Sequence, residues 1–151
     1  DDALATTSTH DLPTLTGWLQ GRDIDWNEDL NLIDPVTANR WRENRHRECE
    51  GLDRALRQDP QNFQEETQGS APTLDASIRF LGHTRAPLVL LPIEDALGLV
   101  EQANLPGTVS GHPNWCRRLP GDCSALLDAI DATRRFELLA CARLQAHERD
   151  R

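Results

Sequence analysis

The strongest hydrophobic pattern in the chain is the apolar run over residues 87–93, PLVLLPI. A short unbroken run that is directly followed by Glu94 and Asp95 is typical of a strand buried on both faces in a parallel sheet. Residues 3–9 are the other candidate strand. Because a two-stranded parallel sheet is not self-sufficient, we expect its remaining strands to lie outside this chain.

Helical spacing of apolar residues dominates the rest of the chain. A short helix is expected from near Thr14 to Gly21, with Trp18 on its core face, and Asp34 and Thr73 are expected to cap two longer helices. These two run to about residue 58 and to Gly82, and the first carries a loose apolar stripe: Val36, Trp41, Cys49, Leu52 and Leu56. Further helices are expected over residues 94–99, 126–130 and 136–144, with a break near residue 131, and loops over 59–72 and 102–115.

Charge and composition narrow the class of protein. The 151 residues include 25 acidic and 16 basic side chains, for a net charge of −9, and every basic residue is Arg. This excess of acid argues against nucleic acid as a partner, since phosphate binding needs clustered cations. The longest apolar run is far shorter than the roughly 20 residues that cross a bilayer, so no membrane partner is expected.

Two further expectations concern the origin of the chain. It starts with Asp1 and contains no Met, which suggests a piece of a longer polypeptide, and no secretion signal is evident, which favours a cytoplasmic location. The four cysteines, at positions 49, 116, 123 and 141, have no CxxC spacing. We therefore expect reduced thiols and no metal centre.

Polar side chains follow each candidate strand. His10 and Asp11 come after the first, and Asn104 lies in the loop after the second. Ligands bind at the carboxyl ends of parallel strands, so these residues are candidates for a binding site. Pro13 disfavours helix at Leu12, so His10 and Asp11 are expected on an extended strand end or in a loop. On an extended chain the two side chains would point in different directions, which suits the binding of hydroxyl groups. In the alternative interpretation, Asp11 caps the helix near Thr14 beside a hydrogen-bonded histidine.

Several strings in series resemble one enzyme family. The string TSTHDLPT at residues 7–14 closely resembles the seventh-strand region of the 4-α-glucanotransferases called amylomaltases, or disproportionating enzymes, of glycoside hydrolase family 77. Three further strings resemble the carboxyl-terminal signature of this family: PIEDALGL at 92–99, EQANLPGT at 101–108 and HPNWCRRL at 112–119. Gly111, Cys116 and Cys123 depart from residues common in the family.

The resemblance implies an α/β fold, the carboxyl-terminal quarter of a (β/α)8 TIM barrel that is predominantly helical as an isolated chain. Residues 1–23 would hold the end of strand seven and an active-site loop, 34–84 outer helices, 87–115 strand eight and its loop, and 124–148 closing helices. The remainder of the same barrel would supply the missing strands.

The resemblance also implies the chemistry. The family transfers an α-1,4-glucan segment to the 4-hydroxyl of another glucan or of glucose with retention, which needs a nucleophile and an acid/base. Its motif places the transition-state stabiliser at Asp11 and sugar contacts at His10 and Asn104. Neither of the other two carboxyl groups lies in this chain, which is expected to be inactive by itself, and no metal or organic cofactor is implied.

Roles outside the reaction are expected for other motif residues. Asp95 is expected to hold the neighbouring loop by hydrogen bonds, Trp115 to pack, and Arg117 or Arg118 to form ion pairs. Two alternatives remain open: an acidic helical module that binds a protein, and a hydrolytic relative among the α-amylase-like enzymes. An exposed apolar patch would favour the first of these.

Overall fold

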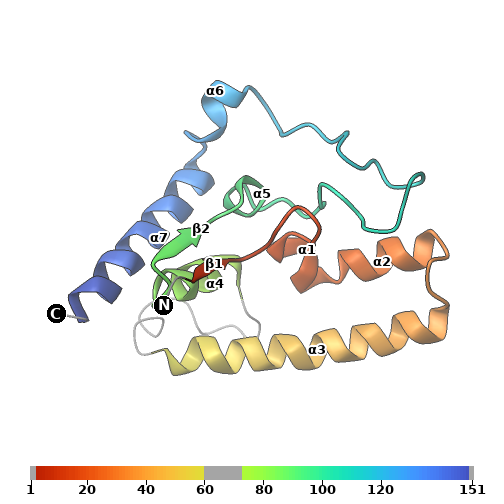
Figure 1. Cartoon of the computed structure of the whole chain (residues 1–151), viewed down its shortest axis with the longest axis horizontal. Helices are drawn as coiled ribbons and strands as arrows, with labels where there is room; N and C mark the ends of the chain where they lie inside the picture. The colour runs from red at the N-terminus through yellow and green to blue at the C-terminus, as the bar shows by residue number, and fades with distance from the viewer. Residues whose placement is uncertain (1–2, 60–72, 150–151) are drawn as a thin grey trace.

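In the computed structural model, which describes residues 3–59 and 73–149, two short parallel strands lie side by side at the centre and helices surround them (Figure 1). Strand β1 (Leu4–Thr6) pairs with β2 (Leu88–Leu90), with Leu4 opposite Leu88. The parallel pairing of the two candidate strands is confirmed. It brings the segments that follow them to the same edge of the sheet.

The prediction that the second strand is buried on both faces is wrong for the described chain. Leu88 and Leu90 are 51% and 49% exposed, and Leu4 of β1 is 51% exposed. The sheet of the described residues has two strands, so no further strand covers its outer edges. These three leucines share one face of the sheet, and the described residues leave that face half uncovered.

Three helices begin where the sequence predicts. Thr14 caps α1 (Leu15–Gln20), Asp34 caps α3 (Pro35–Gln58) and Thr73 caps α4 (Leu74–Gly82). In each case the side-chain oxygen accepts a hydrogen bond from a backbone amide of the first turn, which satisfies a donor that the helix leaves free. Gly21 ends α1 with a left-handed φ of 76°.

The other helices differ from the pattern in detail. Helix α2 (Arg22–Asp29) begins directly after Gly21 and is not apparent from apolar spacing, and α5 (Ile93–Ala96) is shorter than expected. The carboxyl-terminal break lies between α6 (Cys123–Leu126) and α7 (Ile130–Arg149), so Asp131 belongs to α7 rather than to the break. The predicted 59–72 loop falls almost wholly outside the described residues.

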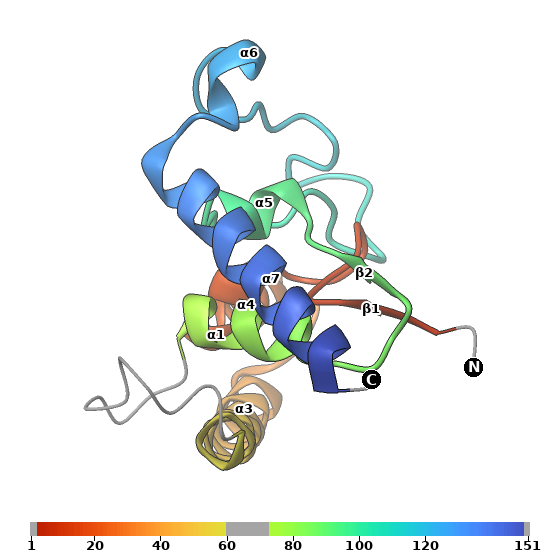
Figure 2. The same cartoon turned by 90° about the vertical axis from the view of Figure 1, so that its left-hand side faces the viewer.

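Helix α4 packs closely along α7, as Figure 2 shows. Ile78 of α4 is fully buried, and Gly82 allows the approach, since a Cβ there would lie 2.5 Å from that of Ala142. Arg135 of α7 joins three elements: its Nε donates to Asp75 of α4 at 2.9 Å and its Nη1 to the Ala96 carbonyl of α5 at 2.8 Å. These contacts form the core behind the sheet.

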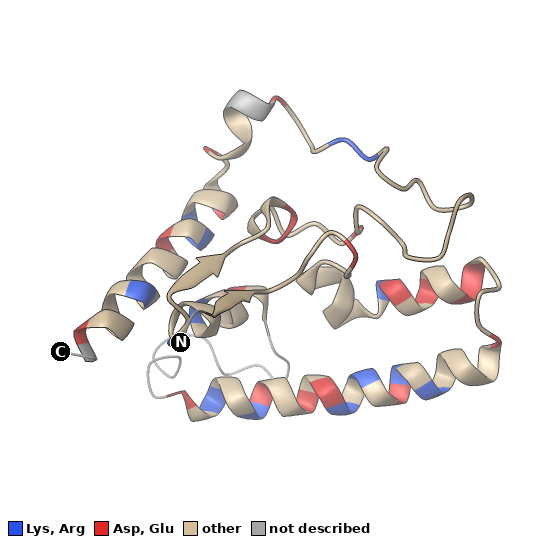
Figure 3. Cartoon of the chain, in the orientation of Figure 1, with Lys and Arg blue, Asp and Glu red and all other residues tan. Residues whose placement is uncertain are grey.

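Charged pairs join α3 to α2. Arg45 forms a bidentate pair with Asp23, at 2.9 and 2.8 Å, and its guanidinium lies 4.7 Å from the centre of the Trp18 ring. In Figure 3 helix α2 carries mainly acidic residues and runs alongside α3, which carries both arginines and acidic residues. The predicted stripe is only partly confirmed, because Leu56 is buried whereas Val36 is 78% exposed.

None of the helices in the described ranges combines the length and hydropathy that crossing a membrane requires.

Candidate functional site

The site lies where the segments after β1 and β2 meet. Residues 9–12 form a turn in which the Leu12 amide donates to the Thr9 carbonyl at 3.1 Å. Of the two expected settings, an extended strand end or a loop, the structure has the loop. The turn brings His10 Nε2 to 3.1 Å from Asp11 Oδ2, so the two side chains do not diverge as they would on an extended chain. Both side chains are more than half exposed and present their polar atoms to solvent.

Asn104 joins this pair from the other loop. Its Nδ2 donates a 2.8 Å hydrogen bond to Asp11 Oδ1, and its own carbonyl accepts 2.6 Å from the side chain of the buried Gln102. The three predicted site residues are thus brought together. The alternative role of Asp11 as a helix cap is wrong, because the hydroxyl of Thr14 accepts the first-turn amide of Gly17 at 3.0 Å.

The carboxylate of Asp95, in α5 after β2, binds the segment that follows β1 by hydrogen bonds. It is fully buried and accepts hydrogen bonds from the Thr7 hydroxyl and, at 2.7 Å, from the Leu15 amide. Burial is the main effect on its carboxyl group and raises the pKa, which these hydrogen bonds only partly offset. The predicted role of Asp95 in holding the loop is confirmed.

A second link lies along α1. The Thr14 hydroxyl donates to the Val100 carbonyl at 3.0 Å, and Gly17 lies against the same carbonyl. A Cβ at Gly17 would lie 2.3 Å from that oxygen, a distance no side chain can adopt without moving the loop. The close approach therefore depends on glycine at this position.

Glu101 lies directly before the loop that carries Asn104, and the sequence reasoning did not assign it a role. Its carboxylate accepts from Arg22 Nε at 2.9 Å, Trp26 Nε1 at 2.7 Å and Arg117 Nη2 at 3.1 Å. Burial alone would raise its pKa, but the hydrogen bonds from Trp26 and Arg22 and the charge of Arg117 outweigh it, and the pKa is lowered. The predicted ion pairing of Arg117 is confirmed. The signal in the sequence was an acidic residue directly before the loop.

The expected packing of Trp115 is not observed. The residue is 64% exposed, and its ring centre lies 5.7 Å from that of His10, with the planes at 39°. With Thr9 and Leu12, the two rings line a depression of about 160 Å³ that also reaches Asp95. The aromatic and polar groups of the two loops therefore border one hollow.

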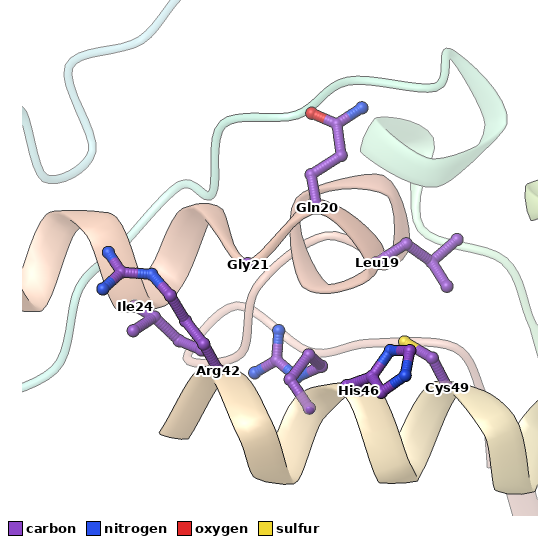
Figure 4. Close-up of a pocket in the computed structure, with 8 residues that line it drawn as sticks. Leu19, Gln20, Gly21, Ile24, Arg42, His46 and Cys49 are labelled. Carbon is purple, nitrogen blue, oxygen red and sulfur yellow. The ribbon is translucent and has the colours of Figure 1, made fainter. Parts of the chain in front are cut away.

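A larger cavity of about 330 Å³ lies elsewhere, between α3 and the first two helices (Figure 4). Arg42 and Arg45 on its wall already pair with acidic residues of α2, and burial raises the pKa of the Cys49 thiol. Since the charged groups on its wall are already paired, this cavity is a gap between packed helices and not a candidate binding site.

The cysteines and possible metal ligands are a separate matter. Cys49, Cys116 and Cys141 are free thiols, whereas the side chain of Cys123 lies outside the described residues. The described residues contain no cluster of three or more His, Cys, Asp or Glu side chains that could hold a metal ion.

The amino-acid sequence of this chain is similar to those of known proteins that share one description. The sequence profile described as 4-alpha-glucanotransferase matches residues 1–124. A 4-alpha-glucanotransferase of Mycobacterium tuberculosis (strain H37Rv) is 31% identical over 145 residues, which cover 91% of this chain and 19% of that protein. One from Haemophilus influenzae is 26% identical over 124 residues, covering 78% of this chain and 18% of that protein.

The solved structures show the same likeness in three dimensions. The crystal structure of amylomaltase from Corynebacterium glutamicum aligns with a TM-score of 0.63 at 21% identity, over 93% of this chain and 21% of that one. The fold is therefore that of a segment of this larger structure. The chain spans about a fifth of the length of the curated relatives it matches.

Proposed function

The chain belongs to the 4-alpha-glucanotransferase family, and we propose that it is the carboxyl-terminal part of an enzyme that transfers α-1,4-glucan segments. The acceptor is the 4-hydroxyl of a second glucan or of glucose, and the reaction is a retaining double displacement. The nucleophile and the acid/base come from the remainder of the protein, so the 151-residue chain by itself is inactive. No metal or organic cofactor takes part.

The observation that carries this proposal is the hydrogen bond between Asn104 and Asp11, which joins residues 93 positions apart. With one oxygen held by the amide and the other 3.1 Å from His10, the carboxylate has a fixed direction and keeps free lone pairs for a ligand. In the proposed reaction Asp11 stabilises the positive charge that develops on the sugar ring. His10 and Asn104 bind hydroxyl groups of the same glucosyl unit.

The barrel assignment belongs to the same proposal. Strands β1 and β2 are strands seven and eight of a (β/α)8 barrel, α3 and α4 belong to the outer layer, and α6 and α7 close the fold. Two observations support it: the two strands are parallel, and Leu4, Leu88 and Leu90 are half exposed on one face of their sheet. In a closed barrel both outer edges of this sheet would be paired and both faces covered. The remaining strands are the partner that covers these leucines.

The test is Asp11→Asn in the full-length protein, assayed for transfer between maltooligosaccharides. The side chain is 53% exposed, so folding is unaffected, while kcat falls by about 10²–10³-fold because a positioned charge is lost. Asp29→Asn, at an exposed position in α2, is the matched control and keeps full activity. Near-normal transfer by Asp11→Asn would remove the assigned role.

The two alternative functions have less support. The family assignment does not favour a helical module that only binds a protein. Transfer rather than hydrolysis agrees with the description of the relatives as glucanotransferases. Product analysis with maltotriose separates these, since transfer yields longer oligosaccharides and hydrolysis yields only shorter ones.

A further inference from the structure

Trp115 stands out because its large aromatic side chain is exposed on a constrained backbone. It is 64% exposed, and its φ is 58°, in the left-handed region that only a few per cent of non-glycine residues adopt. Such a conformation is strained for a residue with a side chain and persists only where the surroundings enforce it. Core packing does not account for it, since most of the indole lies outside the core.

The surroundings do enforce it. The Trp115 amide donates to the Ala103 carbonyl at 2.9 Å. The preceding Asn114 accepts from the Leu105 amide at 2.8 Å and donates to the Thr108 carbonyl at 3.0 Å, so its side chain closes the loop on itself. The backbone that carries the indole is therefore fixed before any ligand arrives, and the ring lies against that of His10. A backbone ordered in advance lowers the entropic cost of binding.

The direction of the indole is towards the candidate site. The ring lies 5.7 Å from His10, centre to centre, and both rings border the depression of about 160 Å³. Asp11 contacts His10 on one side and Asn104 on the other. A flat apolar surface thus stands beside a cluster of hydrogen-bonding groups.

This combination matches the chemistry of a hexose. A glucosyl ring has apolar C–H faces and a polar rim of hydroxyl groups, and sites for such ligands combine aromatic walls with a few placed polar groups. We propose that the Trp115 indole is a stacking platform for a glucosyl unit of the glucan next to the unit that Asp11, His10 and Asn104 bind. The inference rests on the proposed function and names a further contact of the same site.

The experiment compares Trp115→Ala and Trp115→Phe with Trp41→Phe in the full-length protein. Trp41 lies in α3 and is 37% exposed, so it serves as the tryptophan control. By calorimetry, Trp115→Ala weakens maltoheptaose binding by about tenfold, as expected for the loss of one aromatic contact. Trp115→Phe retains most of the affinity, and Trp41→Phe binds as the wild type does.

A second readout would not respond to a merely structural role. Maltoheptaose protects tryptophan fluorescence from quenching by acrylamide in the wild type and in Trp41→Phe, and this protection is absent in Trp115→Phe.

Two results would overturn the inference and leave glucan transfer standing: equal affinity of wild type and Trp115→Ala for maltoheptaose, or an indole already shielded from acrylamide in the free protein. Failure of the wild type to bind maltoheptaose would overturn both proposals together.

Discussion

The side-chain amide of Asn104 donates a 2.8 Å hydrogen bond to Oδ1 of Asp11, although the two residues belong to different loops 93 positions apart. Parallel pairing of β1 with β2 makes this contact, because both loops leave the sheet at the same edge. A hydrogen bond between partly exposed groups contributes only about 1 kcal/mol to stability. Its value is the orientation that it gives to the carboxylate.

The first prediction therefore concerns coupling between these two residues. In the full-length protein, Asn104→Ala lowers kcat/KM for maltooligosaccharides by about tenfold, as expected for one lost hydrogen bond to a charged group. The effect of Asn104→Ala becomes smaller in an Asp11→Asn background, because the oriented group is already altered. Asn39→Ala, exposed in α3, is the control. Strictly additive effects would mean that Asn104 does not act through Asp11.

The second prediction concerns the buried carboxyl of Asp95. Asp95→Ala leaves the Leu15 amide without its partner and lowers the free energy of unfolding by about 2–3 kcal/mol, measured by urea titration. Asp95→Asn keeps an acceptor oxygen and costs less. An unchanged unfolding free energy in the alanine variant would show that the two loops are held by other contacts.

The third prediction is the pH dependence of Asp95. Since burial raises its pKa in the folded state, the unfolded chain releases this proton at lower pH than the folded chain does. The carboxyl therefore carries no penalty below about pH 4, and stability falls as the pH rises through the folded pKa. The difference in unfolding free energy between wild type and Asp95→Asn should change in that sense and then become constant. A change in the opposite direction would contradict the raised pKa.

The fourth prediction is a dependence of stability on pH in the opposite direction, at Glu101. The pKa of Glu101 is lowered in the folded protein, so its ion pairs stabilise the fold above about pH 4.5, and this contribution is lost as the pH falls through the folded pKa. Glu101→Gln removes about 1–2 kcal/mol at neutral pH and a smaller amount at pH 3. Urea titration at both pH values checks it, with Glu43→Gln, exposed in α3, as the control.

The fifth prediction compares two glycines. Gly17→Ala brings a Cβ to within 2.3 Å of the Val100 carbonyl and destabilises the protein by about 1–3 kcal/mol. Gly51→Ala in α3 meets no atom within 4 Å and stabilises it by about 0.5–1 kcal/mol, because alanine is the better helix former. Thermal unfolding of the two variants should shift in opposite directions. A stabilised Gly17→Ala would mean that the loop does not lie against α1.

Local rules explain which features were predictable. Thr14, Asp34 and Thr73 cap their helices because a short polar side chain before a helix satisfies free amides whatever lies around it. The strings at residues 7–14 and 101–119 indicated the family without any structure, and the match over residues 1–124 confirms it. The residues His10, Asp11 and Asn104 were candidates for the same reason: they follow strands in those strings.

The contacts between segments depended on the folded chain. Helix α2 has few apolar residues, and it is held by arginine pairs from α3 and by Glu101, which no periodicity reveals. Trp115 was expected to pack, but it lies exposed beside His10 on a loop that the Asn114 side chain closes. Capping and motif identity are local properties that neighbouring residues set, and so the sequence alone determined them. Burial, charge pairing and the meeting of two loops depend on residues far apart in the chain, and tertiary structure decided these.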